Sequence, residues 1–212
     1  MNHELHIPAA AADGLTVLVL LHGRGADRSD VFGLRPRLPP AWAVVAPDAP
    51  FPGAPWGYGP GRAWYRFLGR NRPEPESFTR SLEALDVLLD ALPGMLGVKP
   101  GRIVLGGFSQ GGTMSLGYAL SRPGRITDIV NFSGFLADHP AVRTTPETVA
   151  GTRFFWGHGR ADPAIPFRLA EEGRATLAAA GAALEAHDYD IGHWIDAGEL
   201  DDMVRWVERT GS

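Results

Sequence analysis

The run "GGFSQGG" at positions 106–112, centred on Ser109, is the first place in this sequence where chemistry could be carried out. It contains the pattern G-x-S-x-G, in which small residues two before and two after the serine permit a sharp turn from a strand into a helix. Glycine weakens both strands and helices, so such a density of glycine needs a reason of this kind. The turn lifts the serine hydroxyl clear of the sheet. Ser109 is therefore the candidate nucleophile.

A serine hydroxyl is a weak nucleophile unless a base accepts its proton. His193 is the histidine whose position suits this task, because the run "DYDIGHWIDAG" puts it in a loop between the last predicted strand and the last predicted helix. The alternative is that His193 is an ordinary surface-loop histidine. His22 and His158 stand at predicted strand ends next to glycines, where we expect them to brace loops.

A carboxylate should orient the imidazole and stabilise its positive charge, and Asp162 is the candidate. It lies just beyond a predicted strand in "FFWGHGRADPAIP", which gives the chain order serine, aspartate, histidine that α/β-hydrolases use. Alternatively, Asp162 caps a helix that begins at Pro163. Asp138 and Asp190 are rival acids, but Asp190 shares a loop with the histidine. We expect Asp162 to serve, because a separate loop lets it hold the ring from behind.

Attack by Ser109 on a carbonyl group would develop negative charge on oxygen, which backbone N–H groups can stabilise. Gln110 begins the predicted helix, so its N–H is available at the helix N-terminus. The second donor is expected from the loop after an early strand, where "LLHGRGAD" supplies the backbone N–H of Arg24. Gly23 and Gly25 on either side of it permit a sharp bend. Arg24 and Gln110 are the candidate oxyanion hole.

The candidate site residues can meet only if the strands before them end close together in one sheet. Two patterns that alternate along the chain, β-prone runs and apolar residues at helical spacing, predict such a sheet. Continuous β-prone runs predict strands over residues 15–23, 42–48 and 102–107, and further strands that start at 126, 152 and 183. Apolar residues at helical spacing predict helices over 77–92, 110–121, 167–180 and 199–209. Alternating strands and helices predict an α/β fold, with a mainly parallel central sheet covered by helices on both faces. We expect a single domain over residues 1–212, with no separate cap domain.

Residues 50–76, "PFPGAPWGYGPGRAWYRFLGRNRPEPE", follow neither pattern and are dense in proline, glycine and aromatic residues. A loop of this length inside a compact domain is uncommon and often forms a lid or a binding loop. The alternative is an irregular surface connection whose aromatic residues pack onto the sheet. We expect a mixture of the two, with a pocket wall formed by Trp56, Trp64, Tyr65 and Phe67.

The composition excludes several classes of protein. A net charge of −4 without a basic run argues against nucleic acid or anionic membrane partners. The chain has no cysteine, which excludes disulfides, a thiol nucleophile and thiolate metal sites. The apolar run at residues 15–21 is too short to span a bilayer and has no basic segment before it, so neither a membrane span nor a signal peptide is expected. A cytoplasmic location is expected by default.

Seven short runs, taken together, resemble the phospholipase/carboxylesterase family of α/β-hydrolases, which includes bacterial carboxylesterases and acyl-protein thioesterases. They occur in order and at suitable spacing, and they read "LLHGRGAD", "APDAP", "AWY", "GFSQGG", "FSG", "GHGRADPAIP" and "GHWI". The resemblance implies a serine hydrolase that acts on a small-molecule carboxylic ester or thioester, with no metal and no organic cofactor. It further implies roles for matching residues: a triad of Ser109, Asp162 and His193, an oxyanion hole of Arg24 and Gln110, and Trp64 and Tyr65 near the acyl pocket.

Two features depart from the family pattern. Arg24 stands where members often have an apolar residue, and we expect it to favour acidic substrates if its side chain faces the cleft. The N-terminal strand region is abbreviated, with only "MNHELHIP" before a loop-like stretch.

Without room for a cap domain, the pocket is expected to be open and shallow, which favours short to medium acyl chains. The protein is expected to be a monomer or a homodimer. Two other function classes stay open: an α/β-hydrolase for amide, peptide or lactone substrates, and a pseudohydrolase that binds a ligand without turnover.

Overall fold

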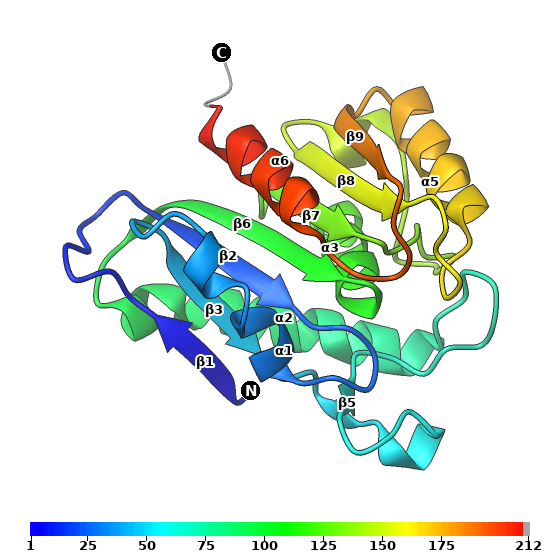
Figure 1. Cartoon of the computed structure of the whole chain (residues 1–212), viewed down its shortest axis with the longest axis horizontal. Helices are drawn as coiled ribbons and strands as arrows, with labels where there is room; N and C mark the ends of the chain where they lie inside the picture. Colours follow the sequence, from blue (N-terminus) through cyan, green and yellow to red (C-terminus); the bar gives the residue numbers. More distant parts are fainter. Residues whose placement is uncertain (210–212) are drawn as a thin grey trace.

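The computed structural model describes residues 1–209 and is built around a seven-stranded sheet (Figure 1). The strand order is β1-β3-β2-β6-β7-β8-β9, and every neighbouring pair is parallel except β1 with β3. These strands are β1 (His3–His6), β2 (Leu15–Leu21), β3 (Ala43–Pro47), β6 (Pro100–Phe108), β7 (Asp128–Phe132), β8 (Arg153–Gly159) and β9 (Ala183–Tyr189). The abbreviated N-terminal region thus supplies a single antiparallel strand at the sheet edge.

The continuous apolar runs form strands that are buried on both faces, as β2 illustrates. Val17, Val19 and Leu21 pack into the hydrophobic layer on one side of the sheet. Leu18 and Leu20 alternate with them and pack into the layer on the other side. A parallel strand covered on both faces has no polar side to present, which is why its sequence shows no alternation.

Helices cover both faces of the sheet, and they divide the core into two layers. One layer packs the sheet against α2 (Pro75–Leu96), α3 (Gln110–Ser121), α4 (Pro146–Val149) and α5 (Phe167–Ala179). The other packs it against α1 (Arg28–Phe32) and α6 (Ala197–Glu208). Figure 1 shows α6 crossing in front of the sheet and α2 and α3 behind it. None of the helices within residues 1–209 combines the length and hydrophobicity that a membrane crossing requires.

The predicted elements are present, with differences at their ends. Helix α2 runs past residue 92 to Leu96 although Pro93 lies inside it, because buried Leu92 and Leu96 continue the apolar face for another turn. Gly97 then ends the helix with φ 69°. Residues 50–76 are less irregular than expected, since β4 (Phe51–Pro52) pairs with β5 (Arg62–Ala63). Helices α1 and α4 are too short for a periodic pattern to reveal them.

The register of the parallel strands brings their carboxyl ends to one edge of the sheet. Gly107 of β6 lies beside Leu21 of β2 and beside Asn131 of β7. On the far side of β7, Gly157 of β8 lies beside His187 of β9. The loops that follow β2, β6, β8 and β9 therefore leave the sheet at the same edge, where ligands usually bind in parallel α/β sheets.

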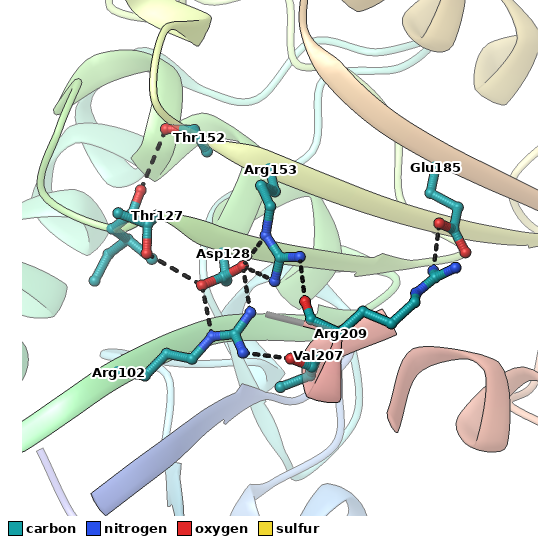
Figure 2. A network of polar contacts seen from close by, with 9 residues as sticks. Arg102, Thr127, Asp128, Thr152, Arg153, Glu185, Val207 and Arg209 are labelled. Atoms are coloured by element: carbon teal, nitrogen blue, oxygen red, sulfur yellow. Dashed lines mark hydrogen bonds and ion pairs between the residues drawn. The ribbon is translucent and has the colours of Figure 1, made fainter. Parts of the chain in front are cut away.

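At the opposite end of the strands, Asp128 joins the sheet to the C-terminal turn of α6 (Figure 2). Its buried carboxylate accepts hydrogen bonds from the guanidinium groups of Arg102 (2.9 and 3.0 Å) and Arg153 (2.7 Å). The same two arginines also donate to the backbone carbonyls of Val207 and Arg209. Charge-assisted bonds of this kind are stronger than neutral ones. These hydrogen bonds hold the C-terminal end of α6 against the sheet. The N-terminal end of the same helix follows the loop that carries His193.

Glu199 lies in the first turn of α6 and is fully buried. Neither of its carboxyl oxygens has a hydrogen-bond partner among residues 1–209. It packs so closely against β8 that a methyl group on Gly157 would collide with it. Burial, and then the nearby Asp196 carboxylate, raises the pKa of Glu199 to about 8. In the folded protein this carboxyl is therefore neutral at pH 7.

We predict that Glu199→Gln stabilises the fold at alkaline pH. Below a pH of 4.5 the carboxyl is protonated in both states, but between 4.5 and about 8 it ionises only in the unfolded chain. Folding stability is therefore lost as pH rises through this window, by about 1.4 kcal/mol for each pKa unit of the shift. Glutamine has no such proton, so the variant should melt several degrees above wild type at about pH 9 and close to it at about pH 5.

Glu83→Gln provides the control, because Glu83 is exposed on α2. Its melting temperature should follow that of wild type at both pH values. An equal gain for Glu199→Gln at both pH values would contradict a titration of Glu199 and would indicate better packing instead.

Candidate active site

Ser109 occupies a strained backbone turn between β6 and α3. Its φ of 55° and ψ of −114° lie outside the regions that side-chain-bearing residues usually adopt. The Ser109 N–H donates to the carbonyl of Phe132 on β7 (2.8 Å), which fixes the turn against the sheet. A methyl group on Gly107 would collide with the backbone of Gly111, and one on Gly111 would collide with the carbonyl of Leu21. These glycines are required because α3 meets β2 and β6 through backbone atoms.

His193 lies between Ser109 and Asp162. Its Nδ1 is 2.6 Å from a carboxylate oxygen of Asp162, and its Nε2 is 2.9 Å from the Ser109 hydroxyl oxygen. An ionised carboxylate can only accept, so Nδ1 carries the proton and donates to it, and Nε2 is left to accept from the hydroxyl. The ring of Phe108 packs against the imidazole, with 4.7 Å between ring centroids. This is the arrangement in which a serine can pass its proton to a histidine.

Asp162 remains ionised although its carboxylate is fully buried. Burial by itself raises its pKa, but hydrogen bonds from His193 and from the backbone N–H groups of Ile165 and Ala164 outweigh burial and lower the pKa. The two backbone bonds (2.8 Å each) hold a turn that precedes α5, which begins only at Phe167. Asp162 therefore caps this turn and not a helix that begins at residue 163.

The two rival carboxylates lie elsewhere. Asp138 is exposed, and its side chain forms no hydrogen bond or ion pair with any residue from 1 to 209. The Asp190 side chain is 97% exposed and lies 3.7 Å from Arg160. Of the three candidates, Asp162 is the one whose carboxylate contacts His193.

His22 and His158 brace the neighbouring loops. The Nδ1–H of His22 donates to the carbonyl of Gly23 (2.7 Å), and its Nε2 accepts from the N–H of Ala49 (3.0 Å). His158 donates from Nε2 to the carbonyl of Ile165 (3.0 Å). Burial lowers the pKa of both histidines, so they stay neutral in these positions. They hold the turn that contains Arg24 and the turn that contains Asp162.

The two candidate oxyanion donors are the backbone N–H groups of Gln110 and Arg24. The Gln110 N–H is the first of α3, so it has no partner within the helix. The Arg24 N–H donates to no other group of residues 1–209. The Gln110 side chain accepts from the N–H of Trp64 (2.7 Å) and donates to the carbonyl of Tyr65 (2.8 Å). This amide therefore joins the start of α3 to the long 50–76 segment.

Two hollows meet at Ser109. The first, which we call the inner cavity, has a volume of about 170 Å³ and is lined by Arg24, Tyr65, Phe67, Ser109, Gln110, Phe135, Ala164, Ile165 and His193. The second, the outer hollow, has a volume of about 360 Å³ and is lined by Gly23, Arg24, Ala26, Asp30, Val31, Leu34, Phe108, Ser109, His193, Trp194 and Ile195. The two share Arg24, Ser109 and His193.

Two of the four aromatic residues expected to form a pocket wall lie elsewhere. Tyr65 and Phe67 line the inner cavity. Trp64 is fully buried and donates from its indole N–H to the carbonyl of His22 (2.9 Å), so it supports the site from inside the core. Trp56 packs on Phe51 within the 50–76 segment and lines neither hollow. Tyr65 is also almost fully buried, so the difference between the two neighbours is which of them borders the inner cavity.

Several lining residues were not identified from the sequence. Phe135 and Ile165 line the inner cavity, and Trp194, 55% exposed, lines the outer hollow. Each of them follows the carboxyl end of a parallel strand within a few residues. That position is a general signal for ligand contact, but it does not reveal which way a loop side chain points.

A mainly parallel sheet with a G-x-S-x-G turn after a central strand defines an α/β-hydrolase. The sequence matches the phospholipase/carboxylesterase family over residues 2–210. The chain therefore belongs to that family.

Two relatives and one solved structure illustrate what this chain is similar to, the solved structure in its fold alone. Acyl-protein thioesterase 1 of Neurospora crassa is 30% identical over 219 residues, covering 93% of this chain and 87% of that protein. A probable inactive carboxylesterase of Oryza sativa subsp. japonica is 31% identical over 139 residues, covering 64% of this chain but only 56% of that protein. The Bacillus cereus carboxylesterase superimposes with a TM-score of 0.82 at 20% identity, covering 99% of this chain and 94% of that one.

These comparisons confirm three predictions made from the sequence: the family, the α/β-hydrolase fold, and an enzyme of the carboxylesterase or thioesterase class.

Proposed function

We propose that this protein hydrolyses carboxylic esters or thioesters of short to medium acyl chains through an acyl-enzyme formed on Ser109. The observation that carries the proposal is the hydrogen-bonded series from Ser109 to His193 to Asp162, placed at a strained turn beside a cavity. Its three residues come from the loops after β6, β8 and β9. We further propose that the chain acts as a single catalytic domain.

In the acylation step, His193 accepts the hydroxyl proton of Ser109 at Nε2 while the serine oxygen attacks the carbonyl carbon of the substrate. Asp162 stays ionised and stabilises the imidazolium that forms, without taking the proton itself. The backbone N–H groups of Arg24 and Gln110 stabilise the negative charge that develops on the carbonyl oxygen. His193 then gives its proton to the departing alcohol or thiol.

In the deacylation step, the same groups act on water. His193 removes a proton from a water molecule, and the resulting hydroxide attacks the acyl carbon of the ester bond to Ser109. The tetrahedral intermediate is again stabilised by the two backbone N–H groups. Its collapse releases the carboxylic acid, and the proton on His193 returns to Ser109.

We predict that Ser109→Ala abolishes covalent labelling by a fluorophosphonate and lowers turnover by roughly 10³-fold or more. The variant retains the cavity and the N–H donors but lacks the nucleophile. Labelling is measured on the intact protein by mass spectrometry, with Ser115→Ala as a control, because Ser115 is buried in α3 and donates to backbone carbonyls. Labelling that persists in Ser109→Ala would identify another residue as the nucleophile.

We predict that Asp162→Asn lowers kcat by roughly 10²- to 10⁴-fold while the fold is retained. The amide can donate to Nδ1 and so favours the tautomer whose Nε2 cannot accept the serine proton. Asp138→Asn and Asp190→Asn serve as controls, and each should cost less than about tenfold. If kcat instead fell strongly in Asp138→Asn or Asp190→Asn while Asp162→Asn stayed active, the assignment of the acid would be wrong.

We predict that hydrolysis is fastest for short to medium acyl chains and declines toward palmitoyl substrates. The inner cavity of about 170 Å³ supports this, because a long chain would have to leave it for solvent. The measurement is kcat/KM across acetyl, butyryl, hexanoyl, octanoyl and palmitoyl esters and thioesters. Rates that kept rising to palmitoyl, with activation at a lipid surface, would contradict the proposal.

A further inference from the structure

The guanidinium group of Arg24 is a cation held at the mouth of the proposed active site. Among residues 1–209, it forms no salt bridge and no side-chain hydrogen bond. It lies 4.7 Å from the ring centroid of Tyr58 and 5.9 Å from that of Phe67. Attraction to aromatic faces positions a cation but leaves its N–H groups free to donate. An arginine in this state can still bind an anion.

Backbone hydrogen bonds hold the turn that contains Arg24. The N–H of Gly25 donates to the carbonyl of Arg62, and the N–H of Arg62 donates to the carbonyl of Ala26 (2.8 Å each). The two segments approach so closely that a methyl group on Gly25 would collide with the carbonyl of Tyr58. The Arg24 turn is thus joined to the 50–76 segment, which carries both aromatic rings.

The two rings are fixed relative to each other as well. The Tyr58 hydroxyl accepts a hydrogen bond from the backbone N–H of Phe67 (2.8 Å). Arg24 is exposed, and its guanidinium lies over two aromatic rings that are fixed relative to each other. Phe67 also lines the inner cavity, so the guanidinium is held at its wall.

The inner cavity contains no acidic side chain that could neutralise this charge. Its lining combines Arg24 and the two reactive residues with apolar groups such as Phe67, Phe135 and Ile165. The outer hollow differs, because the Asp30 carboxylate lies in its lining. A negatively charged substrate group is therefore favoured in the inner cavity, and less so in the outer hollow, where Asp30 shares the lining with Arg24.

The position of the leaving group decides which of the two hollows takes the acyl chain. The leaving group must take its proton from His193, and the residues next to His193, Trp194 and Ile195, line the outer hollow. His193 itself lines both hollows, but Gln110, whose N–H would bind the carbonyl oxygen, lines only the inner cavity. With the leaving group on the Trp194 side, the acyl chain extends past Gln110 toward Arg24 and Phe67.

We propose that Arg24 makes this enzyme selective for esters and thioesters whose acyl chain ends in a second carboxylate, that is, monoesters of short dicarboxylic acids. The inference rests on the proposed function. A wholly apolar chain in the inner cavity would cover the guanidinium without pairing it, which is costly for a charge. A terminal carboxylate can instead accept two parallel hydrogen bonds from it.

The test compares two matched pairs of substrates. Monoethyl glutarate and ethyl valerate differ in whether the acyl chain ends in a carboxylate or a methyl group. Butyryl glycolate and ethyl butyrate share one acyl chain and differ in whether the leaving group ends in a carboxylate or a methyl group. The measurement is the ratio of kcat/KM within each pair, in wild type, Arg24→Leu and Arg24→Lys. A ratio cancels any general effect of the substitution on the oxyanion hole.

Wild type should prefer monoethyl glutarate over ethyl valerate by about threefold or more, as expected for a partly exposed ion pair. Arg24→Leu should remove the preference for monoethyl glutarate or reverse it. Arg24→Lys retains a positive charge and should keep part of the preference. Arg66→Leu is the matched control, because Arg66 is an exposed arginine of the same segment that lines neither hollow. Its ratio should equal that of wild type.

Three outcomes would overturn the inference: no preference in wild type, a preference that Arg24→Leu leaves intact, or a preference confined to butyryl glycolate. Hydrolysis of all four esters without any acid preference would contradict this inference alone. No hydrolysis of any ester, together with no fluorophosphonate labelling of Ser109, would contradict the proposed function itself.

Discussion

The close approach of α3 to the ends of β2 and β6 is the constraint on which the site depends. It is possible only because Gly107 and Gly111 leave no side chain between the strand and the helix. The resulting turn forces Ser109 into a positive φ and directs its hydroxyl toward His193. It also sets the first N–H of α3 beside that hydroxyl. The glycines therefore shape the site through the backbone, and neither of them lines the inner cavity or the outer hollow.

Two buried carboxyl groups in this fold have pKa values that are shifted in opposite directions. Asp162 is surrounded by donors, namely the His193 ring and the N–H groups of Ala164 and Ile165, and its pKa is lowered. Glu199 is equally hidden from water but has no donor among residues 1–209, and its pKa is raised to about 8. Burial opposes ionisation in both cases. What decides the charge is whether hydrogen bonds replace the lost water.

The 50–76 segment connects the Ser109 turn with the Arg24 turn and the inner cavity. The side chain of Gln110 bonds to the backbone at Trp64 and Tyr65, and the backbone of Gly25 bonds to Arg62. One short segment thus fixes the start of α3, the turn of Arg24 and the wall of the inner cavity. In this arrangement Arg24 lines both hollows, and its guanidinium lies against the rings of Tyr58 and Phe67.

The sequence by itself determined the main alternation of strands and helices along the chain, the turn at Ser109 and the loop of His193. These depend on local properties: apolar runs, helical periodicity, and glycines that only a tight turn requires. Tertiary structure alone decided that Asp162 and neither Asp138 nor Asp190 contacts His193. It likewise placed Trp64 in the core and Trp56 outside both hollows. The direction of a loop side chain depends on which distant segment packs against it, and a linear pattern carries no record of that packing.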